Sequence, residues 1–136
     1  MIVLACNAGS TSLKFKLYRM PEKEVLAAGR VERVGSSDDA LFSYRNPQNG
    51  HSLELSGQSI PDYGEGIRRF LACLTEGEGA ALASIGEIAC VAYKPVLSRG
   101  HYEVHEFDES VLGGMREFYD LAPVHTGAYL KAVETV

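Results

Sequence analysis

The sequence predicts a single α/β domain built around a mixed β-sheet. Two apolar runs, 1–6 and 88–93, have the length and the unbroken apolar character of strands that are covered on both faces. Strand patterns fill the first half of the chain, and helical patterns then alternate with a further strand. That order is typical of an α/β domain with a mixed sheet. With 136 residues, the chain has the length of one domain with its own core.

A β-hairpin and a third strand follow directly from the amino terminus. Residues 1–6 form the first strand, residues 7–12 supply turn-forming side chains, and residues 13–18 alternate apolar and polar side chains with period two. Residues 25–34 have the composition of a third strand, in which Gly29 marks a bulge or a point of close approach.

The middle of the chain predicts a peripheral hairpin and then a helix. Residues 41–44 and 52–55 flank an Asn-Pro-Gln-Asn-Gly turn, and we expect this hairpin to be exposed. Apolar residues then recur at helical spacing, which predicts a helix from about Pro61 to Thr75 with Pro61 in its first turn. Gly77 marks the end of this helix.

The last third of the chain predicts a central strand and two further helices. Residues 88–93 form the strand, and Asp108 caps a helix that carries apolar side chains on one face as far as Tyr119. A final helical stretch begins near His125 and reaches Val136 without a capping signal. We therefore expect this chain to be part of a longer protein.

Composition and charge exclude several classes of partner. The net charge is −5, and Lys and Arg are not gathered into a basic stripe, so nucleic acid and acidic membranes are poor partners. The first apolar run is too short for a signal segment or a membrane span. The widely spaced cysteines fit neither a disulfide framework nor a zinc site, and we expect buried, reduced thiols in a cytoplasmic protein. These cysteines are Cys6, Cys73 and Cys90.

The first hairpin turn has the chemistry of a phosphate-binding loop. From Asn7 to Lys14 the sequence is Asn-Ala-Gly-Ser-Thr-Ser-Leu-Lys. Gly9 lets the backbone approach a phosphate, so that successive N–H groups can surround its oxygens. Lys14 adds a positive charge on the same side of its strand as Ser12. A plain hairpin made soluble by small polar residues is the alternative interpretation. The hydroxyl donors of the turn are Ser10, Thr11 and Ser12.

The complete string, placed directly after an N-terminal strand, closely resembles the first signature of acetate kinases and related carboxylate kinases. These belong to the actin/sugar-kinase/Hsp70 superfamily, whose other branches usually have Asp at the position of Asn7. The resemblance implies a ribonuclease H-like (actin-like ATPase) fold, with residues 1–136 as the N-terminal domain of a two-domain protein. It also implies that the loop from Asn7 to Ser12 and Lys14 contact nucleotide phosphates, and that Asn7 is a candidate metal contact.

A second landmark of that family, Gly-His-Arg-Val-Val-His-Gly-Gly, is similar to residues 92–99 in degraded form. Lys94 stands where the family has an arginine that helps to hold the phosphoryl group or the carboxylate. Lysine keeps the charge but lacks the planar fork. Val96 matches an apolar position of the acyl pocket, whereas Tyr93 and Leu97 replace both histidines of the motif.

A third landmark, Leu-Ala-Pro-Leu-His-Asn-Pro, is similar to residues 121–127. Val124 and His125 fall on the acyl-pocket and active-site histidine positions, while Thr126 and Gly127 replace the Asn-Pro. The resemblance therefore implies Lys94 and His125 as catalytic residues, and Val96 and Val124 as the substrate pocket.

The implied activity is ATP-dependent phosphoryl transfer to acetate or another short-chain carboxylate, with Mg²⁺. Direct in-line transfer needs no covalent enzyme intermediate, so a nucleophile triad is not required. The resemblance implies small-molecule partners and a homodimer of the full-length protein. The distal Asp, Arg and Glu of the family would lie beyond Val136, so this chain alone is expected to be inactive. The degraded second motif leaves open a non-catalytic relative that keeps the fold or nucleotide binding only. Asn7 disfavours an actin-like assembly module.

Overall fold

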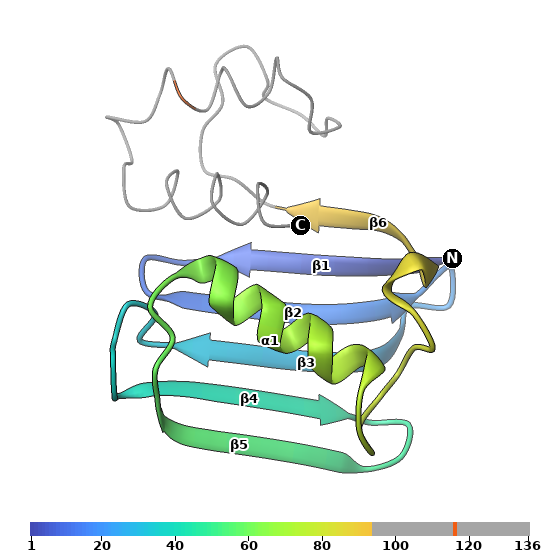
Figure 1. Ribbon diagram of the computed structural model, residues 1–136. Coiled ribbons are helices and arrows are strands. Elements are labelled where there is room, and N and C mark those ends of the chain that lie inside the picture. The colour runs from blue at the N-terminus through green and yellow to red at the C-terminus, as the bar shows by residue number, and fades with distance from the viewer. Residues whose placement is uncertain (94–115, 117–136) are drawn as a thin grey trace.

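A computed structural model describes residues 1–93 and Arg116, and all structural statements concern these residues. They form one mixed sheet, one α-helix and one short 3₁₀ helix (Figure 1). In chain order the elements are β1 (Ile2–Ala8), β2 (Ser12–Arg19), β3 (Glu24–Glu32), β4 (Ala40–Asn46), β5 (His51–Gln58), α1 (Tyr63–Thr75), η1 (Ile85–Glu87) and β6 (Ile88–Tyr93).

The sheet has the strand order β5-β4-β3-β2-β1-β6. The strands from β1 to β5 pair antiparallel with their neighbours along the chain, whereas β6 pairs parallel with β1. A parallel pair needs a long crossover connection, and the segment that contains α1 supplies it. The predicted α/β domain with a mixed sheet is confirmed.

Helix α1 lies across one face of the sheet (Figure 1). Its Phe70 ring stacks on Phe15 of β2, with 4.4 Å between the ring centroids. Gly29 of β3 lies beneath the same ring, and a Cβ atom at Gly29 would come within 2.5 Å of Phe70 Cδ2. The predicted point of close approach at Gly29 is therefore confirmed, because only a residue without a side chain leaves space for the ring.

The two ends of α1 have clear local causes. Asp62 is the N-cap, and its Oδ1 accepts a hydrogen bond from the Glu65 N–H at 2.8 Å. Pro61 therefore precedes the helix, and its predicted place in the first turn is wrong by two residues. After the C-cap, Gly77 has a φ of 75°, which a residue without Cβ adopts at low cost.

The expectation of an exposed second hairpin is wrong for one of its two strands. The side chains of Phe42 and Tyr44 in β4 are buried, and the Tyr44 hydroxyl donates to the Gly79 carbonyl oxygen at 2.7 Å. The edge strand β5 is the exposed partner. The turn residues predicted the hairpin correctly but could not indicate that β4 reaches the core beside α1.

In the described part of the sheet β6 is the last strand beside β1, and the residues that follow Tyr93 lie outside that part, so the expected central position of strand 88–93 stays a prediction. Cys90 is exposed, contrary to the expectation of buried thiols, whereas Cys6 is buried as expected and Cys73 is half-buried. The predicted helices near Asp108 and His125 lie outside the described residues, apart from Arg116, which is helical. In the described part of the chain, no helix is long and apolar enough to cross a membrane.

Candidate functional site

The turn between β1 and β2 is closed by its own backbone. The Gly9 N–H donates to the Ser12 carbonyl oxygen at 2.8 Å. A Cβ atom at Gly9 would lie 2.6 Å from Ser12 Oγ, so an alanine there would force that hydroxyl to move. Glycine at this position therefore avoids a steric clash with the Ser12 hydroxyl.

Protein donors also hold the next carbonyl groups of the turn. The Tyr63 hydroxyl lies 3.0 Å from the Gly9 carbonyl oxygen and 2.6 Å from that of Ser10. The Val34 N–H donates to the Thr11 carbonyl oxygen at 3.0 Å. Three successive carbonyl groups are thus turned toward the body of the domain.

The direction of the carbonyl groups fixes the direction of the N–H groups. In a trans peptide the C=O and the following N–H point in opposite directions, and the only cis bond in residues 1–93 precedes Pro21. The N–H groups of Ser10 and Thr11 therefore point away from Tyr63. Within residues 1–93 and Arg116 these two N–H groups make no hydrogen bond.

The hydroxyl groups of the turn add further donors. Ser10 and Thr11 are exposed and Ser12 is half-buried. In the described part of the chain, none of these three hydroxyls donates to or accepts from another group of the protein. A run of oriented backbone N–H groups beside hydroxyl groups is a suitable site for a phosphate or another oxyanion.

Asn7 and Lys14 lie beside this turn as direct cross-strand partners in β1 and β2. Phe15 contacts α1, so the alternation of side chains along β2 places Lys14 on the opposite face of the sheet. Both Asn7 and Lys14 line a hollow of about 840 Å³ on that face. The structure thus brings the predicted hairpin residues and both flanking polar residues to one end of the sheet.

The hollow carries an excess of positive charge. Lys14 lies directly opposite Arg30 of β3, and Arg30 forms an ion pair with Glu32 at 3.2 Å. Lys14, Lys16 and Arg45 line the same hollow, and none has an ion pair in the part of the chain that the structure describes. Neighbouring like charges on a sheet are unfavourable unless an anion offsets them, so this face favours anionic ligands.

Burial keeps two groups near the hairpin in their protonated forms. Burial raises the pKa of Tyr63 above its ordinary value, so its hydroxyl remains a hydrogen-bond donor at neutral pH. Burial also raises the pKa of the Cys6 thiol to about 12, so this group is a neutral core side chain. Neither group supplies charge to the site.

The described residues offer no ligand set for a metal ion. Within residues 1–93 and Arg116, no three His, Cys, Asp or Glu side chains come together in a group that could hold one. A bound Mg²⁺ usually needs one or two carboxylates together with substrate phosphates. The metal contact assigned to Asn7 therefore stays a prediction.

The other predicted site residues, Lys94, Val96, Val124 and His125, lie outside the described residues. The described residues of strand β6 reach the hairpin end of the sheet, because Tyr93 is the register partner of Cys6.

Tyr63 was missed as a site residue by sequence reasoning. In the sequence, Tyr63 is one of the apolar residues whose spacing predicts the helix. No local pattern connects it with a turn more than fifty positions away. The positive face could have been recognised, because Lys14 and Lys16 alternate with buried residues along a single strand.

Known proteins are similar to this chain over nearly its whole length. The model of the acetokinase family matches residues 2–136. An acetate kinase of Symbiobacterium thermophilum is 36% identical over 135 residues, which cover 98% of this chain and 33% of that protein. An acetate kinase of Bacteroides fragilis is 34% identical over 137 residues, which cover 100% of this chain and 34% of that protein.

Solved structures agree as well. The Porphyromonas gingivalis acetate kinase superposes with a TM-score of 0.87 at 30% identity, over 98% of this chain and 33% of that one. A Francisella tularensis propionate kinase superposes with a TM-score of 0.72 at 18% identity, over 98% and 33% of the two chains, and supports the fold alone.

These comparisons confirm the predicted actin-like ATPase fold of the ribonuclease H-like class. The chain spans about a third of the length of the curated relatives that it matches. Both the family model and the relatives extend over nearly all of this chain. The chain therefore belongs to the acetokinase family.

Proposed function

We propose that the full-length protein transfers the γ-phosphoryl group of ATP to acetate or another short-chain carboxylate, giving an acyl phosphate and ADP. The observation that carries this proposal is the orientation of the first hairpin, whose carbonyl groups are held inward so that the Ser10 and Thr11 N–H groups point outward. Membership in the acetokinase family supports the choice of reaction.

In this proposal the hairpin positions phosphate oxygens, and it takes no covalent part in the reaction. The backbone N–H and hydroxyl groups of residues 10–12 donate hydrogen bonds, and Lys14 offsets negative charge at the edge of the same site. Bound ATP supplies the phosphoryl group. Transfer of this kind depends mainly on position and charge neutralisation, and oriented backbone donors contribute both.

Four residues outside the described part of the chain complete the proposed site. Lys94 offsets charge at the transferred group, and His125 donates a hydrogen bond to it. Val96 and Val124 contact the acyl chain of the carboxylate. Mg²⁺ would be held by the phosphates and by residues beyond those described here, because the described residues provide no carboxylate ligand set.

The proposed setting is that of a cytoplasmic enzyme with small-molecule partners. The carboxylate and the nucleotide are its ligands, and nucleic acid and membranes are not. We propose a homodimer for the full-length protein.

The direct test is acyl-phosphate formation by the full-length protein. ATP is supplied with acetate, propionate or butyrate, and the product is trapped with hydroxylamine as the hydroxamate. We expect product with at least one acid and much less with the Lys94→Ala variant. If none of the three acids gives product above the Lys94→Ala background, the proposed reaction is rejected.

A non-catalytic relative is the second candidate, and the altered second motif favours it. Tyr93 and Leu97 stand where the resemblance implies histidines, and Lys94 stands in place of an arginine. A protein of this kind would bind inorganic phosphate or ATP through the hairpin and form no acyl phosphate. Saturable phosphate binding without product, with all three acids, would favour this candidate over the first.

A further inference from the structure

We propose that Tyr63 is a positioning residue that fixes the outward direction of the Ser10 and Thr11 N–H groups. A clamp, formed by the hydrogen bonds of Arg69 with Gln58, Ser59 and Glu65, holds Tyr63 in place. The inference rests on the proposed role of the hairpin in phosphate binding. It concerns a residue that lies outside all three signature motifs.

The Tyr63 hydroxyl lies between two successive carbonyl oxygens of the turn. It is 2.6 Å from the Ser10 oxygen and 3.0 Å from the Gly9 oxygen. A phenol has one proton, so the shorter contact is the principal hydrogen bond and the longer contact shares it. Because each carbonyl is rigidly linked to the next N–H, this single hydroxyl sets the orientation of the Ser10 and Thr11 donors together.

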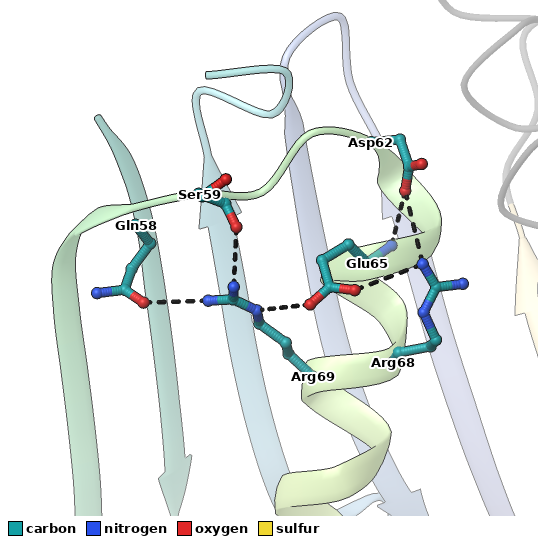
Figure 2. A network of polar contacts seen from close by, with 6 residues as sticks. All are labelled: Gln58, Ser59, Asp62, Glu65, Arg68 and Arg69. Atoms are coloured by element: carbon teal, nitrogen blue, oxygen red, sulfur yellow. Dashed lines mark hydrogen bonds and ion pairs between the residues drawn. The ribbon is translucent and has the colours of Figure 1, made fainter. Parts of the chain in front are cut away.

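Tyr63 is the first residue of α1, and the segment before it is fastened to the helix (Figure 2). The Arg69 guanidinium donates from Nε to Glu65 Oε1 at 3.1 Å. It also donates from Nη1 to Gln58 Oε1 at 3.1 Å and from Nη2 to the Ser59 carbonyl oxygen at 2.8 Å. One planar side chain thus joins the end of β5, the connecting segment and the first turn of the helix.

A second set of backbone hydrogen bonds holds the same region. The Ile60 N–H donates to the Ser36 carbonyl oxygen at 3.2 Å, and the Gly35 N–H donates to the Ile60 carbonyl oxygen at 2.8 Å. The neighbouring Val34 N–H donates to the Thr11 carbonyl oxygen at 3.0 Å. The segment before α1 and the hairpin therefore share a common support, in which Tyr63 supplies the side-chain contact.

Orientation before binding has a functional value for an anion site. Donors that already point at the ligand do not have to be reoriented when it arrives, so less of the binding free energy is lost to ordering. A hairpin of small residues such as Gly9, Ser10 and Thr11 has few side-chain contacts of its own to restrict it. A fixed external hydroxyl is an effective way to supply that restriction.

Tyr44 provides a matched control for the loss of a phenolic hydroxyl. Its hydroxyl donates to the Gly79 carbonyl oxygen at 2.7 Å, and its ring contacts the same Phe70 core. Tyr44→Phe thus removes a similar hydrogen bond from the core without touching the hairpin. Comparison with Tyr63→Phe separates a general loss of stability from a specific effect on the hairpin.

The experiment measures ¹⁵N relaxation and a titration with inorganic phosphate on the chain 1–136 and its variants, each checked for folding by thermal unfolding. We expect Tyr63→Phe to lower the backbone order parameters of Ser10 and Thr11 and to raise the Kd for phosphate about fivefold, as loss of one ordinary hydrogen bond allows. Tyr44→Phe is expected to match the wild type in both measurements.

Arg69→Lys is a second variant that leaves the Tyr63 ring unchanged. It keeps the charge but loses the fork that joins Gln58 and Ser59. We therefore expect Arg69→Lys, like Tyr63→Phe, to lower the backbone order parameters of the hairpin. Arg19→Lys is its control, because the ion pair of Arg19 is with Glu24, at the far ends of β2 and β3 from the hairpin and outside α1. If the backbone order parameters of Ser10 and Thr11 are unchanged in Arg69→Lys, the proposed role of the clamp is rejected.

The positioning role of Tyr63 is overturned if Tyr63→Phe leaves the order parameters of Ser10 and Thr11 at wild-type values, or if Tyr44→Phe lowers them equally. Absence of any phosphate-induced shift in the wild-type Ser10 and Thr11 amides would instead reject phosphate binding by the hairpin. The relaxation comparison would still decide for or against Tyr63 in that case, so the two failures are distinguishable.

Discussion

The hydroxyl of Tyr63 lies 2.6 Å from the carbonyl oxygen of Ser10, although the two residues are 53 positions apart in the chain. This contact joins the start of the helix to the turn between the first two strands. It makes the shape of the candidate phosphate site depend on how α1 packs against the sheet. Changes in the helix, the sheet and the turn should therefore have separable effects.

Gly29→Ala is expected to destabilise the domain strongly. The added Cβ would lie 2.5 Å from Phe70 Cδ2 and 3.1 Å from the Ser43 carbonyl oxygen, within a buried ring stack. Overpacking of this kind costs about 1–3 kcal/mol of unfolding free energy. The measurement is urea unfolding, with Gly86→Ala as control because its Cβ would meet only Ser84 Oγ at 3.4 Å. Equal stability of the two variants would contradict the packing described for Gly29.

Asp62→Ala is expected to weaken the start of α1. The Asp62 carboxylate accepts a hydrogen bond from the Glu65 N–H at 2.8 Å, and loss of an N-cap costs about 1 kcal/mol. Thermal unfolding should show a lower Tm for Asp62→Ala than for Asp62→Asn, since asparagine can still cap the helix. If the two variants unfold at the same temperature, the capping hydrogen bond is not the source of the effect.

Lys14→Gln is expected to reduce phosphate binding by the chain several-fold. Lys14 lies beside the hairpin with no ion pair in the described part of the chain, so its charge is available to an anion. Loss of one charge–phosphate contact should raise the Kd by roughly three- to tenfold at low salt, and by less at high salt. Lys23→Gln, in the turn between β2 and β3, makes the same charge change away from the hairpin and should have little effect. The prediction fails if both variants lose the same affinity.

Alkaline pH should destabilise the domain partly through Cys6. Burial raises the pKa of the Cys6 thiol from 9.0 to about 12. The folded state therefore retains a proton that the unfolded state loses, so this contribution is fully present below about pH 9 and is lost as the pH rises toward 12. Cys6→Ala should flatten the fall of unfolding free energy over this range, whatever its effect at neutral pH.

The chain 1–136 by itself is expected to show no carboxylate kinase turnover. It spans about a third of its curated relatives, and the proposed reaction needs groups from the remainder. The hydroxamate assay that tests the full-length protein also tests this expectation. Acyl phosphate formed from ATP by residues 1–136 alone would refute it.

The local pattern of the sequence determined most of the individual elements. The alternation of side chains along β2 and the apolar run of β1 predicted the first hairpin. The helical spacing of apolar residues predicted α1, and Gly29 was marked as a place of close approach. These features depend on residues that are near one another in the chain, and for that reason they can be recognised in the sequence. The string from Asn7 to Lys14 likewise predicted the family correctly.

Only the tertiary structure decided which faces are covered and which distant groups meet. Periodicity shows that a strand has an apolar face, but it does not show what lies against that face. The burial of β4 was therefore predicted wrongly. The contact from Tyr63 to Ser10 depends on a helix packing across the sheet, and no pattern within either segment encodes it. The sequence alone predicted a phosphate-binding role for the hairpin, and the packing of α1 decided which way its backbone N–H groups point.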